Sequence, residues 1–151
     1  MNIVGKYDDS SVELEGTAEA LHELSQVIRE LVEAKDLSLA LPSTSPTPYL
    51  GYLESVRIEQ GTGKVCISRT GNQVLISGSP EMLTILSHNI ESMPELQRRP
   101  ASGMDRDHVH IEYYPGHFYL KEESVPLVFT KCASSVGTTH ESVRKPPSNA
   151  L

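Results

Sequence analysis

The sequence predicts an α+β fold: two duplicated strand-strand-helix-strand halves that form one mixed, mainly antiparallel sheet with two helices packed on one face. Three observations support this prediction. Two stretches carry apolar residues at helical spacing, several short stretches alternate apolar and polar residues, and these patterns recur at an offset of 62 residues. Amphipathic helices and strands with one apolar face need a shared core, and that combination belongs to the α+β class.

The repeat is clearest where each helix begins. When the chain is shifted by 62 positions, residues 16–28 align with residues 78–90, and six of the thirteen positions are identical. The alignment continues upstream without a gap, where Val12 aligns with Val74. We therefore interpret the chain as an internal duplication.

This interpretation sets the domain organisation. One α+β domain is expected over residues 1–131, with halves at residues 1–60 and 62–131. In residues 132–151 the composition shifts to Ser, Thr, Pro and Gly without apolar periodicity, so this segment is expected to be a disordered tail.

The first half is expected to contain two strands, a helix, an apolar segment that is either a short strand or a tether, and a closing strand: residues 2–7, 11–15, 18–34, 37–41 and 52–60. Leu21, Leu24 and Ile28 lie on one stripe of the helix. Thr17 is its expected N-cap, because a hydroxyl can accept a hydrogen bond from the first turn. Three prolines within residues 42–48 predict a loop.

The second half is expected to repeat this plan, with two strands, a helix, a polar loop and two further strands: residues 63–69, 73–77, 80–93, 94–106, 107–114 and 125–130. Ser79 is the expected N-cap, and Pro80 follows at the first helical position, where proline is favoured. Pro94 is expected just past the helix end. Two closing strands resemble each other, at residues 56–59 and 109–112.

Composition excludes several classes of protein. The chain has 151 residues, of which 38% are apolar and 22% charged, and this suffices for a modest core. No apolar run is long enough for a transmembrane helix, and the N-terminus lacks the layout of a signal peptide, so a cytoplasmic protein without a membrane partner is expected. Cys66 and Cys132 are too few for a disulfide framework and lack metal-ligand spacing.

The charge balance bears on the kind of partner. The formal net charge is −7, and residues 131–151 carry a local excess of positive charge, so the domain itself is more acidic still. Such a surface repels phosphate backbones, which argues against nucleic acid. It attracts a basic protein partner, although acidity that serves solubility alone is the alternative.

Residues 105–119 are the segment richest in chemistry, with three of the six histidines and three of the six tyrosines. On a strand, His108, His110, Glu112 and Tyr114 share one face. Pro115-Gly116 then fits a type II turn. The polar face of the sheet is expected to be open and to carry Glu13, Glu15, Arg57, Glu59, His108, His110 and Glu112.

Two functions are compatible with this face. The first is binding of a protein partner, because aromatic residues with polar tips are frequent at the centres of interfaces. The partner-binding residues would be His108, His110, Glu112, Tyr114 and Tyr119. The alternative at these positions is structural, with Tyr113, Phe118 and Tyr119 serving as core or rim packing.

The second function is metal binding. His108 and His110 can place both imidazoles on one zinc ion, with His117 or Asp107 completing the site. A metal-dependent hydrolase would then be the enzymatic alternative, with a histidine as general base. No Gly-x-Ser-x-Gly motif is present and neither cysteine has a histidine beside it, so a non-catalytic protein is the main expectation.

The two helix entries, at residues 16–21 and 78–83, resemble those of the immunity protein 32 family of bacterial polymorphic toxin systems. The runs at residues 108–117 and 124–127 resemble uncharacterised bacterial proteins close to that family. The resemblance covers residues 60–130 and extends to the first half through the repeat. The proline-rich loop and the tail have no counterpart. The resemblance implies a small cytosolic protein that binds and neutralises a toxin and performs no chemistry of its own.

Overall fold

The computed structural model describes residues 1–31, 35–96 and 107–132, and only the backbone at residues 93–96 and 107. It confirms the α+β class. In chain order the elements are β1 (Ile3–Tyr7), β2 (Val12–Gly16), α1 (Ala18–Glu30), β3 (Asp36–Ala40), β4 (Gly51–Tyr52), β5 (Ser55–Gln60), β6 (Cys66–Thr70), β7 (Gln73–Gly78), α2 (Pro80–Leu96), β8 (Asp107–Ile111) and β9 (Leu127–Lys131). The predicted tail lies outside the described residues except for Cys132.

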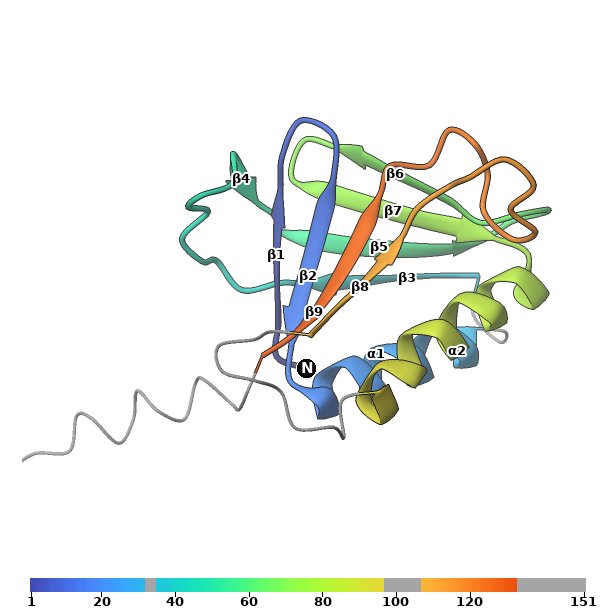
Figure 1. Cartoon of the computed structure of the whole chain (residues 1–151), viewed down its shortest axis with the longest axis horizontal. Coiled ribbons are helices and arrows are strands. Elements are labelled where there is room, and N and C mark those ends of the chain that lie inside the picture. The colour runs from blue at the N-terminus through green and yellow to red at the C-terminus, as the bar shows by residue number, and fades with distance from the viewer. Residues whose placement is uncertain (32–34, 97–106, 133–151) are drawn as a thin grey trace, which may run out of the picture.

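The strands form two sheets, so the prediction of one continuous sheet is wrong (Figure 1). The larger sheet has the order β4-β1-β2-β9-β8, and the smaller has the order β3-β5-β7-β6. Both are mixed and mainly antiparallel: among the named strands of the described residues, β2–β9 and β5–β7 pair in parallel and the other pairs are antiparallel. The physical reason for two sheets is the area that must be covered. Two helices cannot cover one face of a single sheet of nine strands, whereas two sheets bury their apolar faces against each other as well.

Each sheet combines strands from both predicted halves. The hairpin β1–β2 is continued by β9 and β8, and the hairpin β6–β7 is continued in the same relative orientations by β5 and β3. The counterpart of β5 is therefore β9, and the predicted equivalence of residues 56–59 with residues 109–112 is wrong. The matching strand orders agree with a duplication, which itself remains a prediction.

The two helices pack against each other and close the space between the sheets (Figure 1). Both predicted N-caps are confirmed: Thr17 Oγ1 accepts a hydrogen bond from Ala20 N at 3.1 Å, and Ser79 Oγ accepts one from Met82 N at 3.2 Å. α2 continues past the predicted end and includes Pro94, although a proline there removes one backbone hydrogen bond and crowds the carbonyl group four residues earlier.

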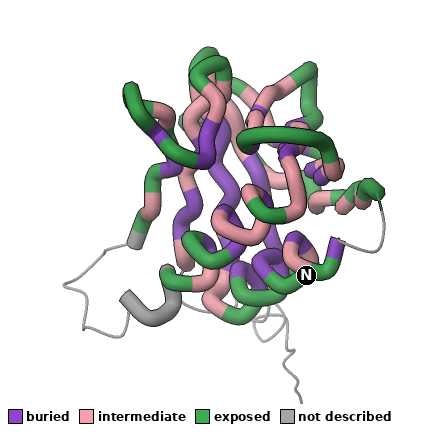
Figure 2. Tube along the Cα trace, turned by 90° about the vertical axis from the view of Figure 1, so that its right-hand side faces the viewer, coloured by how far each residue is buried: buried purple, intermediate pink, exposed green. Residues whose placement is uncertain are grey.

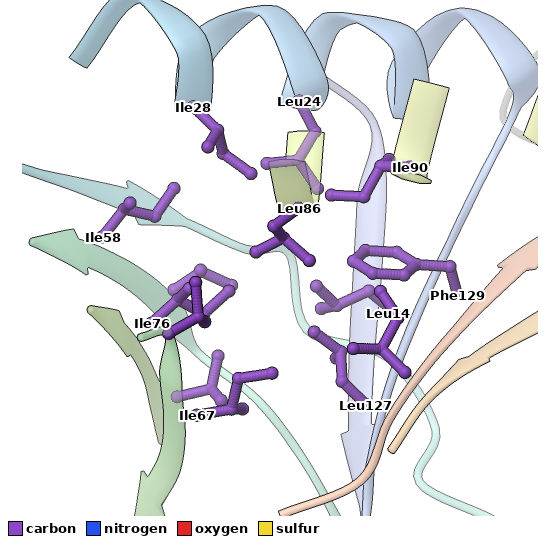
Figure 3. Close-up of a cluster of buried hydrophobic side chains, with 14 of the residues drawn as sticks. Leu14, Leu24, Ile28, Ile58, Ile67, Ile76, Leu86, Ile90, Leu127 and Phe129 are labelled. Carbon is purple, nitrogen blue, oxygen red and sulfur yellow. The ribbon is translucent and has the colours of Figure 1, made fainter. Parts of the chain in front are cut away.

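One core lies between the sheets and the helices. In Figure 3, side chains from the smaller sheet, the larger sheet and both helices point toward the same interior, for example Ile76, Phe129 and Leu24. In Figure 2, buried residues lie in the centre of the molecule and exposed residues lie around them. This shared core holds β8, β9 and α2 together, and those elements carry the candidate site.

The predicted open polar face is divided between the sheets and is partly closed. Arg57 and Glu59 lie on β5 in the smaller sheet, while Glu13 lies on β2 in the larger sheet. Glu13 is only 6% exposed, so it is not part of an open surface. A side chain just after the proline-rich loop contributes to this burial, as described below.

Candidate functional site

An open pocket of about 340 Å³ lies where α2 faces the edge strand β8 and the turn that follows it. Its described lining residues come from α2, from β8 and from the eight residues after β8: Asn89, Ser92, Val109, His110, Ile111, Glu112, Tyr114, His117, Phe118 and Tyr119. Of the residues predicted for partner or metal binding, the described lining includes all except His108 and Asp107.

A tight turn sets the shape of this pocket. β8 ends at Ile111, three residues before the predicted strand end. His117 N then donates a hydrogen bond to the Tyr114 carbonyl oxygen at 2.9 Å, and Gly116 has a φ of 89°. A positive φ at the third residue is the signature of the predicted type II turn. The turn brings the residues after it back beside Tyr114.

His117 is a buried residue at the base of the pocket. It is 6% exposed, and its Nδ1 accepts hydrogen bonds from the backbone N–H groups of Leu120 at 3.2 Å and Tyr119 at 3.4 Å. Nδ1 must therefore be the unprotonated nitrogen, and Nε2 carries the hydrogen. Burial lowers the pKa of His117, and the positive charge of Lys64 lowers it further. The imidazole is consequently neutral at pH 7.

Aromatic rings surround His117. Its ring centroid lies 4.5 Å from that of Tyr114 and 4.7 Å from that of Tyr119, and the Phe118 and Tyr119 centroids are 5.4 Å apart. Tyr114 is 56% exposed and Phe118 is 61% exposed. Two aromatic side chains thus project into solvent from a rigid base of buried rings.

Tyr119 belongs to that base, and its role in partner binding stays a prediction. It is 4% exposed, and its hydroxyl accepts a hydrogen bond from Asn89 Nδ2 at 2.7 Å. Burial raises the pKa of Tyr119, so the phenol stays neutral. Tyr119 is therefore buried, whereas Phe118 is exposed.

The three predicted metal ligands are not brought together. His108 lies outside the pocket, with Nδ1 3.3 Å from Thr130 Oγ1, while the Nδ1 atom of His117 is occupied by backbone N–H groups. Within residues 1–31, 35–96 and 107–132, no group of three His, Cys, Asp or Glu side chains is placed to hold a metal ion. The side chain of Asp107 lies outside the described part.

A polar network connects Tyr49, the residue after the proline-rich loop, to the larger sheet. Thr130 Oγ1 donates a hydrogen bond to the buried carboxylate of Glu13, and the Tyr49 hydroxyl also bonds to Glu13. Burial and the bond to Glu13 raise the pKa of Tyr49 to about 12. Lys6 Nζ lies 5.7 Å from the centroid of the Tyr49 ring. No motif in the sequence indicated this contact, because its members are far apart along the chain.

The pocket carries little charge. Glu112 is the one residue with a formal charge at pH 7 among its described lining residues, and it is exposed. Asn89 and Ser92 line the pocket from α2 and were not predicted, because polar residues beside the apolar stripe of a helix are ordinary. His22 and His88 are exposed, and both lie near Glu91.

Residues 73–132 match the family described as immunity protein 32, which confirms the resemblance inferred from the sequence over this segment. The matched segment spans β7, α2, β8 and β9 and contains every described lining residue of the pocket. No curated protein and no solved structure matches the chain. Neither α1 nor α2, as described, is long and apolar enough to cross a membrane.

Proposed function

We propose that this protein binds a protein toxin and neutralises it by binding alone, using the surface around the pocket. We call this surface the aromatic patch and define it as His110, Glu112, Tyr114 and Phe118. The proposal rests on the match of residues 73–132 to immunity protein 32. One observation carries the assignment of the surface: two solvent-exposed aromatic side chains flank a pocket inside that matched segment.

The exposure of these aromatic side chains is unusual for this chain. Only four large hydrophobic side chains of the described residues are strongly exposed, and Tyr114 and Phe118 are two of them. Aromatic residues are the commonest energetic centres of protein interfaces, because they bury a large area at low entropic cost. The buried ring system beneath them favours binding further, since a surface that is already ordered loses little freedom on association.

The charge of the chain supports a basic partner. The formal net charge is −7, and Glu112 adds a negative charge to the patch itself. Complementary charge speeds encounter and disfavours acidic competitors. A basic toxin is therefore the partner that this surface fits best.

The test is capture of the toxin from host lysate by wild type and by two kinds of variant. Tyr114→Ala and Phe118→Ala each truncate the patch, and we expect each to weaken affinity about thirtyfold, corresponding to about 2 kcal/mol. Leu50→Ala is the matched control, because Leu50 is 62% exposed and lies outside the patch. A protein captured by wild type and Leu50→Ala but lost by both patch variants supports the proposal. Equal capture by all four proteins would show that the patch is not the binding surface.

Neutralisation is tested with the captured protein. Its expression alone should arrest growth of a test bacterium, and co-expression with wild type should restore growth. Inhibition by binding requires about one copy of this protein for each toxin molecule. Protection at far lower ratios would indicate that the toxin is modified catalytically, and the proposal of a non-catalytic binder would then be wrong.

A further inference from the structure

We infer that the pocket between α2 and β8 receives an arginine side chain of the partner, with its guanidinium against the rings of Tyr114 and Phe118 and near the Glu112 carboxylate. This inference rests on the proposed function and specifies how the partner is recognised. It follows from the charge, the hydrogen-bonding groups, the rings and the size of the pocket.

The charge of the pocket favours a cation. Glu112 is the one formally charged lining residue at pH 7 within the described part, and neither lysine nor arginine is among the described lining residues. His117 beneath the pocket stays neutral, because burial lowers its pKa. Lys64 lies next to the pocket, where its Nζ donates to the His117 carbonyl oxygen at 2.8 Å, but it is not among the described lining residues. A bound cation would meet one carboxylate and no opposing lining charge.

Three side chains of the pocket offer acceptors to a hydrogen-bond donor. Ser92 uses its hydroxyl proton on the Asn89 carbonyl oxygen at 2.8 Å, so its oxygen lone pairs remain as acceptors. Asn89 directs Nδ2 to the Tyr119 hydroxyl, which leaves the amide oxygen of its side chain as an acceptor. Together with the Glu112 carboxylate, these are three acceptors, and a guanidinium presents five N–H donors in one plane.

The rings and the volume favour arginine over other cationic side chains. Guanidinium is planar and weakly hydrated, so it stacks on aromatic faces more readily than the compact, strongly hydrated ammonium of lysine. The volume of about 340 Å³ lies at the lower end of the range for ligand pockets, roughly 300–1,000 Å³. It therefore suits one long side chain.

The probe for this inference is Nα-acetyl-arginine amide, titrated into the full-length ¹⁵N-labelled protein and followed by NMR. Its matched control is Nα-acetyl-citrulline amide, which has nearly the same shape and no charge. We expect arginine to shift the amide signals of Glu112, Tyr114 and Phe118. We also expect it to bind about tenfold more tightly than citrulline, because a cation–π contact and a nearby carboxylate together stabilise a charged ligand by about that factor. Equal binding of the two probes, absence of shifts, or shifts confined to other acidic surfaces would overturn the inference.

Two variants identify the groups responsible. Glu112→Gln and Phe118→Leu should each weaken arginine binding severalfold, whereas Glu122→Gln, at an exposed glutamate outside the pocket, should leave it unchanged. An equal effect of Glu112→Gln and Glu122→Gln would overturn the inference, because general acidity alone would then explain binding.

Failure of this inference is distinguishable from failure of the proposed function. If Tyr114→Ala abolishes toxin capture while the arginine probe does not bind, the arginine pocket is wrong and toxin binding through the patch stands. If arginine binds selectively while toxin capture survives Tyr114→Ala and Phe118→Ala, the pocket chemistry is supported and the proposed binding surface is wrong.

Discussion

His117 acts on the aromatic patch through its hydrogen bonds and its neutrality. Its Nδ1 accepts two backbone N–H groups in a buried place, and protonation of Nδ1 would remove both acceptor interactions. Because the folded state lowers the pKa of His117 below its ordinary value of 6.5, the stabilisation is fully present above pH 6.5. It is lost as the pH falls through the lowered folded-state pKa.

The variant His117→Ala tests this role. It leaves two buried N–H groups without an acceptor, and we expect the free energy of unfolding to fall by about 1–3 kcal/mol at pH 7. His117→Asn, whose side-chain oxygen can accept in place of Nδ1, should retain part of that stability. Both variants should lose less stability than wild type between pH 7 and pH 5, as measured by urea unfolding. A wild-type loss equal to that of the variants would contradict the assigned role.

Tyr49 gives a second prediction at the scale of one residue. Its pKa is raised to about 12, chiefly by burial and then by its bond to Glu13. A raised pKa means that the stabilisation holds below the ordinary value of 10.0 and is lost as the pH rises toward 12. Glu13→Gln should lower the Tyr49 pKa by removing the negative charge, and ultraviolet titration of tyrosinate measures this. An unchanged titration in Glu13→Gln would show that Tyr49 does not contact Glu13.

At the scale of the elements, an ion pair of Arg29 and Glu91 joins α1 to α2 across their contact. Arg29 Nη1 and Nη2 lie 2.6 Å and 3.0 Å from the two carboxylate oxygens of Glu91. The side chains are 27% and 28% exposed, so the pair is partly screened by solvent. This two-pronged geometry fixes the relative position of the helices more than it adds stability.

A double-mutant cycle of Arg29→Ala and Glu91→Ala measures the pair. We expect a coupling free energy of about 0.5–1 kcal/mol at low salt, and a smaller value in 1 M salt. Chemical unfolding of the four proteins gives the result. A coupling near zero at low salt would mean that the pair contributes nothing, and apolar packing alone would hold the helices.

Local patterns predicted the elements well because their causes are local. Alternation identified β2, helical spacing identified α1, and the side chains of Thr17 and Ser79 marked both helix starts. Strand pairing was not predictable. β2 pairs with β9, which lies more than a hundred residues later in the chain, and nothing in the sequence of either strand specifies its partner. The exchange of strands between the predicted halves depends on how the whole core is covered.

Local patterns also predicted part of the candidate site. A strand periodicity placed His110, Glu112 and Tyr114 together, and the turn sequence placed His117 near them. Periodicity ends at the turn, however, so it did not show that Phe118 is exposed and Tyr119 buried. It also did not show that α2 contributes Asn89, since Asn89 contacts Tyr119, which lies thirty residues later in the chain.

At the scale of the whole molecule, the net charge of −7 predicts how association depends on salt. Attraction between an acidic protein and a basic toxin should speed encounter, and salt should screen it. We expect the association rate constant to fall at least about tenfold between 20 mM and 500 mM salt, while the dissociation rate constant changes little. Stopped-flow mixing measures both. An association rate that is independent of salt would contradict a basic partner.

The most direct test of the central claim is hydrogen–deuterium exchange of this protein, free and bound to the captured toxin. If the aromatic patch is the binding surface, amides in residues 108–119 should exchange more slowly in the complex. Residues 36–50, which include the control position Leu50, should be unchanged. Slower exchange confined to residues 36–50, with none at residues 108–119, would contradict the account and place the toxin on β3 and the loop that follows it.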